Sequence, residues 1–148
     1  MKRTLISARV TLWMNRLIAL IVAAMLFAIP FLLDWYSNYR ILSESEYLTI
    51  AIAFYCCAPV IGIALWNLEK LLQSILVQSV FTVSNVKRIR AIRWCCAGVS
   101  LICLPAAFIY LPLSFLVIIM GFLSLVVHVV AQVMAAAVAL REENDLTI

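Results

Sequence analysis

Charged residues are scarce in this sequence, and their scarcity excludes a soluble globular domain. Only 12% of the 148 residues are charged and 67% are apolar, whereas soluble domains carry about 25% charged and about 45–50% apolar residues. A water-soluble fold of this length cannot bury so much hydrocarbon. With three glycines and four prolines, the chain also lacks the composition of collagen and of disordered segments.

Motifs that carry chemistry are missing as well. The sequence contains no nucleophile elbow, no phosphate-binding loop and no H-E-x-x-H pattern. Histidine occurs once, and the five cysteines form no C-x-x-C pair, which argues against a zinc site and a disulfide framework. We interpret the cysteines as small apolar packing residues. The prediction is a protein that is not an enzyme, with no catalytic residues, no cofactor and no metal ion.

What the sequence does contain is four long apolar blocks. They run over residues 17–33, 48–68, 94–111 and 113–140, and none includes Asp, Glu, Lys or Arg. A helix of about 20 apolar residues, rising 1.5 Å per residue, crosses a bilayer. The first block is too long for the apolar core of a signal peptide, so we expect a retained helix. The fold class predicted is all-α: one polytopic membrane domain over residues 1–148, a four-transmembrane-helix bundle.

The cationic residues gather on one side of these four spans. Four precede the first span, five lie in the connection 69–93 and one lies in the tail 141–148, while Arg40 alone lies in the loop 34–47. The positive-inside rule therefore places both termini, the connection and the tail in the cytoplasm. The loop 34–47 is predicted to lie outside.

The stretch 81–94, FTVSNVKRIRAIRW, holds most of the positive charge of the connection. Its cationic residues are Lys87, Arg88, Arg90 and Arg93. Ser84 or Asn85 is the expected N-cap of a helix that runs into the third span. On that helix, Val86, Ile89 and Ile92 are expected to face the lipid boundary while the cations reach the headgroups. Because the stretch is not part of a compact domain that could recognise DNA or RNA, no direct nucleic-acid binding is expected.

The second span also continues past the membrane, through the helical pattern NLEKLLQSI. The two extensions together predict a short helical hairpin in the cytoplasm, which is the largest surface available to a soluble partner. The candidate partner surface combines its cations with the charged tail: Lys70, Lys87, Arg88, Arg90, Arg93, Glu142, Glu143, Asn144 and Asp145. The alternative for the tail is that its acidic residues lie against the basic segment of the same chain.

The last span carries a stripe of polar residues. Ser124, His128 and Gln132 recur at intervals of four and share one helix face. We favour a role as hydrogen-bonding contacts between helices, because no acidic residue in any span is available to form a proton relay with His128. The alternative is a small transporter, channel or immunity-type subunit that acts as a homo-oligomer, with this intramembrane stripe lining a cavity. Ala58 and Gly62 add a small-xxx-small pair that allows close helix approach.

Two phrases of the sequence resemble a known family. The C-terminus matches E-N-D-L-T-[IV] at Glu143, Asn144, Asp145, Leu146, Thr147 and Ile148, and a central phrase like K-L-L-x-x-I begins at Lys70. The chain is similar over roughly residues 48–148 to the YoaS-like group of small bacterial membrane proteins of unknown function. The resemblance implies four spans in the bacterial cytoplasmic (inner) membrane.

The genes of that group often stand beside a helix-turn-helix regulator of the Xre type. The resemblance therefore implies a transcription regulator as partner, besides the membrane lipids. We expect a regulatory or interaction protein whose cytoplasmic face docks such a regulator.

Overall fold

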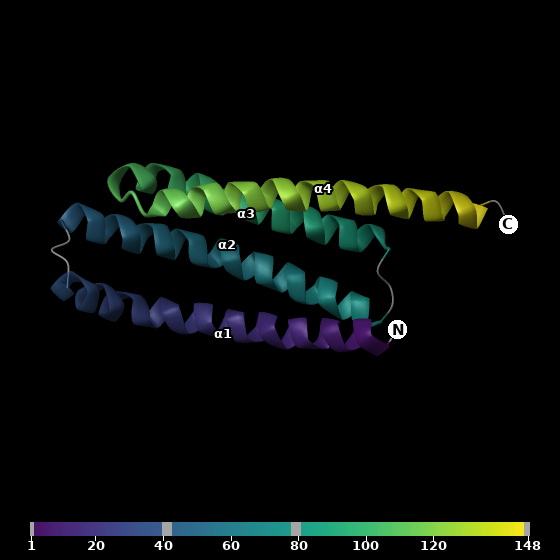
Figure 1. Cartoon of the computed structure of the whole chain (residues 1–148), viewed down its shortest axis with the longest axis horizontal. Coiled ribbons are helices and arrows are strands. Elements are labelled where there is room, and N and C mark those ends of the chain that lie inside the picture. Colours follow the sequence, from purple (N-terminus) through teal and green to yellow (C-terminus); the bar gives the residue numbers. More distant parts are fainter. Residues whose placement is uncertain (1, 40–42, 78–80, 147–148) are drawn as a thin grey trace.

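The chain folds into four long helices joined by short connections. The computed structural model describes the backbone of residues 2–39, 43–77 and 81–146, and side chains within these ranges from 7 to 144. The helices are α1 (Lys2–Tyr39), α2 (Glu44–Leu76), α3 (Val83–Ile109) and α4 (Leu113–Leu146) (Figure 1). Across the described ranges no strand occurs, which confirms the all-α prediction.

Each helix is longer than the hydrocarbon core of a bilayer is thick. The shortest, α3, has 27 residues and the longest, α1, has 38, which at 1.5 Å per residue gives about 40 to 57 Å. The hydrocarbon core of a bilayer measures about 30 Å. All four helices are long and apolar enough to cross a membrane, as the sequence predicts. This composition and length indicate a multi-pass membrane protein.

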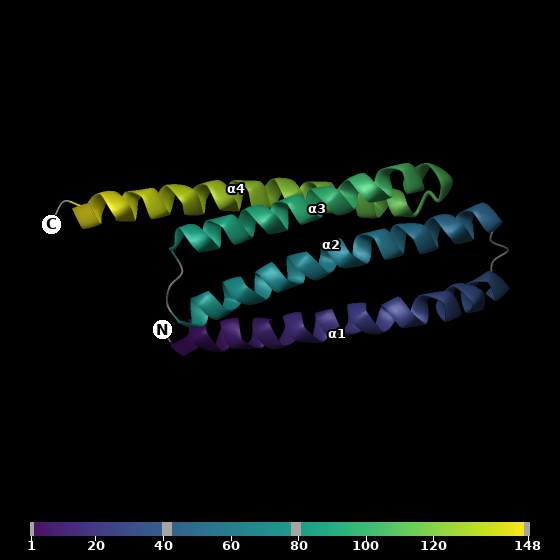
Figure 2. The same ribbon diagram turned by 180° about the vertical axis from the view of Figure 1, so that it is seen from behind.

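The helices pack side by side in the order of the chain. α1 packs on α2, α2 on α3 and α3 on α4. Among the described residues, α1 reaches past α2 at the Tyr36 hydroxyl, which lies 3.4 Å from the hydroxyl of Tyr110, the C-cap of α3. Figures 1 and 2 show α1 at one edge of this open layer and α4 at the other. Both termini lie at the same end of the molecule, which we call the terminal end. The opposite end, where α1 joins α2 and α3 joins α4, is the turn end.

The packed centre lies between α2, α3 and α4. Cys57 of α2 and Val99 and Cys103 of α3 form a buried cluster, and Val117 and Met120 of α4 pack against it. The two sulfur atoms are 3.6 Å apart as free thiols, so these cysteines serve as compact packing residues. Small side chains at this seam let neighbouring helices approach closely.

Most of the segment 69–93, predicted to connect the second and third spans, belongs to the ends of α2 and α3. α2 continues to Leu76, which confirms the predicted extension, and α3 begins at Val83. The N-cap of α3 is Thr82, whose hydroxyl accepts from the backbone N–H of Asn85. The prediction of Ser84 or Asn85 as the cap was wrong because Thr82 offers an earlier hydroxyl in extended backbone.

The expected lipid-facing side of this segment was also assigned wrongly. Val86 and Ile89 are each only 5% exposed, because the first turns of α3 pack on the last turns of α2. Two helices that leave the bilayer together bury their apolar sides against each other. Val86 and Ile89 therefore do not face the lipid boundary.

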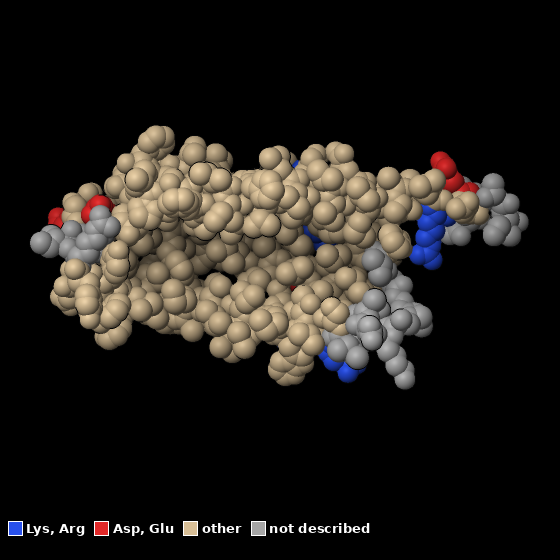
Figure 3. Space-filling view, in the orientation of Figure 1, with Lys and Arg blue, Asp and Glu red and all other residues tan. Residues whose placement is uncertain are grey.

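Charge is concentrated toward the ends of the layer. On the face shown in Figure 3, the long middle is almost uniformly uncharged, and the Lys and Arg side chains lie toward the terminal end. Asp and Glu side chains occur at both ends of that face. An uncharged belt between two polar ends is the pattern of a chain that spans a bilayer.

Candidate functional site

A polar network holds the α2–α3 hairpin at the terminal end. Asn85, only 1% exposed, donates from Nδ2 to the Ser74 hydroxyl at 2.7 Å. Arg88 donates from Nη1 to the Lys70 carbonyl at 3.1 Å and to Asn85 Oδ1 at 3.3 Å. We call these four residues, with the Thr82 cap, the junction network. Its buried polar groups fix the angle between the two helix ends, because an unpaired buried group is costly.

The junction network divides the cationic residues that the sequence assigned to one partner surface. Arg88 is turned into the hairpin, and the Lys70 ammonium lies over the Trp66 ring, 5.3 Å from its centroid. Lys87 and Arg90 are exposed on the outside of α3. The free positive surface of the hairpin therefore consists of two residues, one turn of helix apart.

Arg93 turns in the opposite direction, toward α4. Its Nη1 lies 2.6 Å from Nδ1 of His128, and its own backbone carbonyl accepts from the Ser124 hydroxyl at 3.2 Å. The guanidinium also stacks on Trp94, 4.9 Å from the ring centroid. The predicted polar stripe of α4 therefore faces α3, and its partner is a cation.

The contact with Arg93 assigns the tautomer of His128. An arginine has only donors, so His128 Nδ1 accepts in this contact and Nε2 carries the N–H. Gln132 lies 3.1 Å from that Nε2. The Gln132 atom at that distance is Nε2; since two N–H groups cannot bond to each other, we assign the flipped amide, with Oε1 toward the ring. Both ring nitrogens are then engaged in contacts that join α3 to α4 and brace α4 itself.

The charged tail lies on the last turns of α4. Glu142, Glu143 and Asn144 are exposed, while the side chain of Asp145 lies outside the described residues. Figures 1 and 2 both show the C-terminal part of α4 extending beyond the first turn of α3. The tail is thus an acidic helix end that projects past the basic hairpin, at the same end of the molecule.

Sequence reasoning missed a polar contact between α1 and α2. Asn15 is 3% exposed and donates from Nδ2 to the Leu65 carbonyl at 3.2 Å. Its Oδ1 is buried without a hydrogen-bond partner. Next to it, Arg16 pairs with Glu69 at 2.9 Å, and Gln73 donates to the same carboxylate at 3.3 Å.

A signal for Asn15 was present in the sequence. Ala8, Leu12 and Asn15 follow one another at spacings of four and three, which places them on one helix face. All three are buried. The spacing would have assigned Asn15 to the face of α1 that meets α2.

The described part of the chain brings together no three metal-ligating side chains. The arrangement instead consists of apolar spans, a charged terminal end and three sets of polar contacts, one at each interface between neighbouring helices. These features define a class, the small multi-pass membrane proteins. A family model for proteins of unknown function, DUF2975, matches residues 8–148. The chain therefore belongs to the DUF2975 family, which supports the prediction of an uncharacterised family. No curated protein and no solved structure matches it.

Proposed function

We propose that this protein is a non-enzymatic membrane anchor that docks a soluble partner protein on its terminal end, and that this end faces the cytoplasm. The distribution of Lys and Arg along the sequence supports that orientation by the positive-inside rule. The proposal also includes the bacterial inner membrane as the location.

The observation that carries the proposal is the hydrogen-bonded α2–α3 hairpin with two exposed cations. Lys87 and Arg90 are exposed on α3, whereas the neighbouring Arg88 and Asn85 are occupied by the junction network. A basic patch on a fixed scaffold favours an acidic surface, because little conformational freedom is lost on binding. A flexible loop with the same residues would offer no such platform.

The partner that fits is a small helix-turn-helix transcription regulator with an acidic patch outside its DNA-binding helix. The similarity to the YoaS-like group suggests this class, since those genes often stand beside an Xre-type regulator. Held at the membrane, such a regulator would be separated from its operator. The exposed acidic end of α4 extends the platform by adding a region of opposite charge, which sets the orientation of the docked partner.

The test is co-purification of the regulator encoded beside this gene with the tagged membrane protein in mild detergent. We expect Lys87→Glu and Arg90→Glu each to reduce recovery of the regulator by about five- to thirtyfold, since reversing a contact charge costs on the order of 1–2 kcal/mol. Arg9→Glu is the matched control. Arg9 is exposed on α1 at the same end, so its reversal removes equal charge and leaves the hairpin intact.

Two results would contradict the proposal. One is recovery of the membrane protein without the regulator under conditions in which both are abundant. The other is an equal loss of the regulator in Arg9→Glu and Arg90→Glu, which would indicate a general charge effect.

A further inference from the structure

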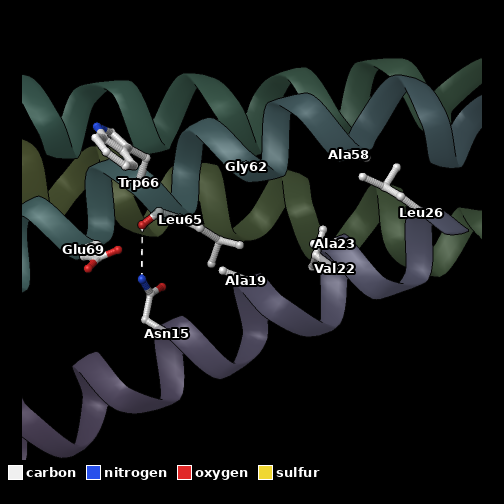
Figure 4. A pocket seen from close by; sticks show the side chains of 10 residues that line it. All are labelled: Asn15, Ala19, Val22, Ala23, Leu26, Ala58, Gly62, Leu65, Trp66 and Glu69. Atoms are coloured by element: carbon white, nitrogen blue, oxygen red, sulfur yellow. Dashed lines mark hydrogen bonds between the residues drawn. The ribbon is translucent and has the colours of Figure 1, made fainter.

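A groove separates α1 from α2 along residues 15–26 of α1 and 58–69 of α2. It has a volume of about 220 Å³. Asn15 and Glu69 stand at one end and Leu26 at the other, and the walls between them are built from small residues such as Ala19, Ala58 and Gly62 (Figure 4). A Cβ atom added at Gly62 would meet nothing within 4 Å. The groove is therefore open space, with one polar end and an apolar length.

The polar end contains an unsatisfied acceptor. Asn15 is 3% exposed, and its Oδ1 has no hydrogen-bond partner. Figure 4 shows the amide nitrogen bonded toward Leu65, while the oxygen points away from that bond, along the groove toward Ala19. A buried carbonyl oxygen left unpaired costs about 1–3 kcal/mol. A ligand that donates a hydrogen bond at this point would remove that cost.

The length and width of the groove fit one lipid chain. Asn15 and Leu26 are eleven residues apart on α1, or about 17 Å along the helix axis. One leaflet contributes about 15 Å to the hydrocarbon thickness. A volume of about 220 Å³ spread over that length leaves a slot too narrow for a helix, whose diameter is about 10 Å or more. An unbranched acyl chain is the membrane component that fills such a slot.

The charges at the polar end select the headgroup. The Arg16 guanidinium, paired with Glu69 at 2.9 Å and half exposed, can contact a lipid phosphate. Asn15 Oδ1 and the Glu69 carboxylate are both hydrogen-bond acceptors, and the negative charge of Glu69 favours a cationic N–H donor over a neutral hydroxyl. We propose that this groove is a binding site for a phospholipid with a primary ammonium headgroup, a phosphatidylethanolamine, in the leaflet at the terminal end.

The experiment is native mass spectrometry of the full chain, released from micelles that contain equal amounts of phosphatidylethanolamine and phosphatidylcholine with identical acyl chains. Phosphatidylcholine keeps the charges and the tails but has no N–H donor. We expect one retained lipid per chain, with a preference for phosphatidylethanolamine of about three- to tenfold, the range for one hydrogen bond.

Three substitutions separate the parts of the site. Gly62→Leu fills the groove, and we expect the retained lipid to be lost. Ala24→Leu adds the same bulk at an exposed position of α1, and we expect the lipid to remain. Asn15→Leu removes the acceptor, and we expect a lipid to be retained without headgroup preference. Far-ultraviolet circular dichroism of each variant verifies that the helices are intact.

Several outcomes would overturn the proposal. Equal retention of the two lipids by the wild type would remove the role of Asn15, and retention of the lipid by Gly62→Leu as by Ala24→Leu would remove the role of the groove. Release of the wild type as a lipid-free dimer that dissociates in Gly62→Leu would assign the groove to a second copy of the chain.

Discussion

The contact between Arg93 and His128 makes a quantitative prediction about what holds α4 in place. α4 packs mainly on α3, and none of the residues in the most apolar stretch of α4 is buried. Lipid tails are as apolar as its side chains, so the hydrophobic effect contributes little to the association of α4 with α3. The attraction between α3 and α4 therefore comes from van der Waals packing and from the hydrogen bonds of Arg93, Ser100 and Ser124.

The magnitude follows from the geometry. Hydrogen bonds between membrane helices contribute about 0.6 kcal/mol on average and up to about 1.7 kcal/mol in double-mutant cycles. The Nη1–Nδ1 distance of 2.6 Å is short and the donor is charged, which favours the upper half of this range. We expect a coupling of about 1–1.7 kcal/mol between Arg93→Leu and His128→Leu. The measurement is reversible unfolding in mixed micelles as the fraction of denaturing detergent rises.

A second cycle provides the control. Arg90 lies one turn before Arg93 and is exposed, so Arg90→Leu combined with His128→Leu should show a coupling near zero. Equal couplings in the two cycles would refute the assignment of Arg93 and His128 as the contact that fixes α4. If the stripe serves a transport pathway instead, His128→Leu should abolish flux in proteoliposomes while stability stays near that of the wild type.

Three further predictions concern topology and the other polar contacts. Reporter fusions should place both termini in the cytoplasm, and a fusion that reports the two ends on opposite sides would reject the positive-inside assignment. Asn85→Ala should lower the free energy of unfolding by about 1–3 kcal/mol because it opens a buried network. The side chain of Asn67 bonds within its own helix, so Asn67→Ala should lower that free energy by less than about 0.5 kcal/mol. Similar losses in the two variants would contradict the burial argument. Arg16→Ala should change stability by no more than about 1 kcal/mol because its side chain is 52% exposed, and a loss of several kcal/mol would show that the pair with Glu69 acts as a buried one.

The four helices could be predicted because the relevant signal is local in the sequence. A run of about 20 uncharged residues is long enough to cross a bilayer as a helix, and recognising it needs no knowledge of the neighbouring helices. The helical continuation of α2 could be predicted for the same reason, since a periodic pattern is a local property. The DUF2975 match then agrees with an uncharacterised family.

The contacts between helices could not be predicted in the same way. A span that is apolar on all sides gives no indication of which side meets protein and which meets lipid. Likewise, the spacing of Val86 and Ile89 identified a shared helix face but not what covers it, so they were assigned to the lipid boundary although they pack within the hairpin. The pairing of Arg93 with His128 depends on the vertical register of α3 against α4, which is set by the short turn between them.

The partner surface was only partly recognisable for a related reason. The number of cationic residues in a connection says nothing about which of them are already occupied. Arg88 and Lys87 are neighbours in the sequence, yet one donates to α2 and the other is exposed. Only the register of the hairpin distinguishes them.

The chain-order packing of the layer bears on how the protein is made. Each helix after α1 packs on the helix synthesised just before it, so its main packing partner is already present when it enters the membrane. Each new segment leaving the translocon finds its docking face already in the lipid, and the search for native contacts covers little sequence separation. Biogenesis of this protein should therefore proceed span by span, and a nascent chain cut after α2 should already hold the α1–α2 pair.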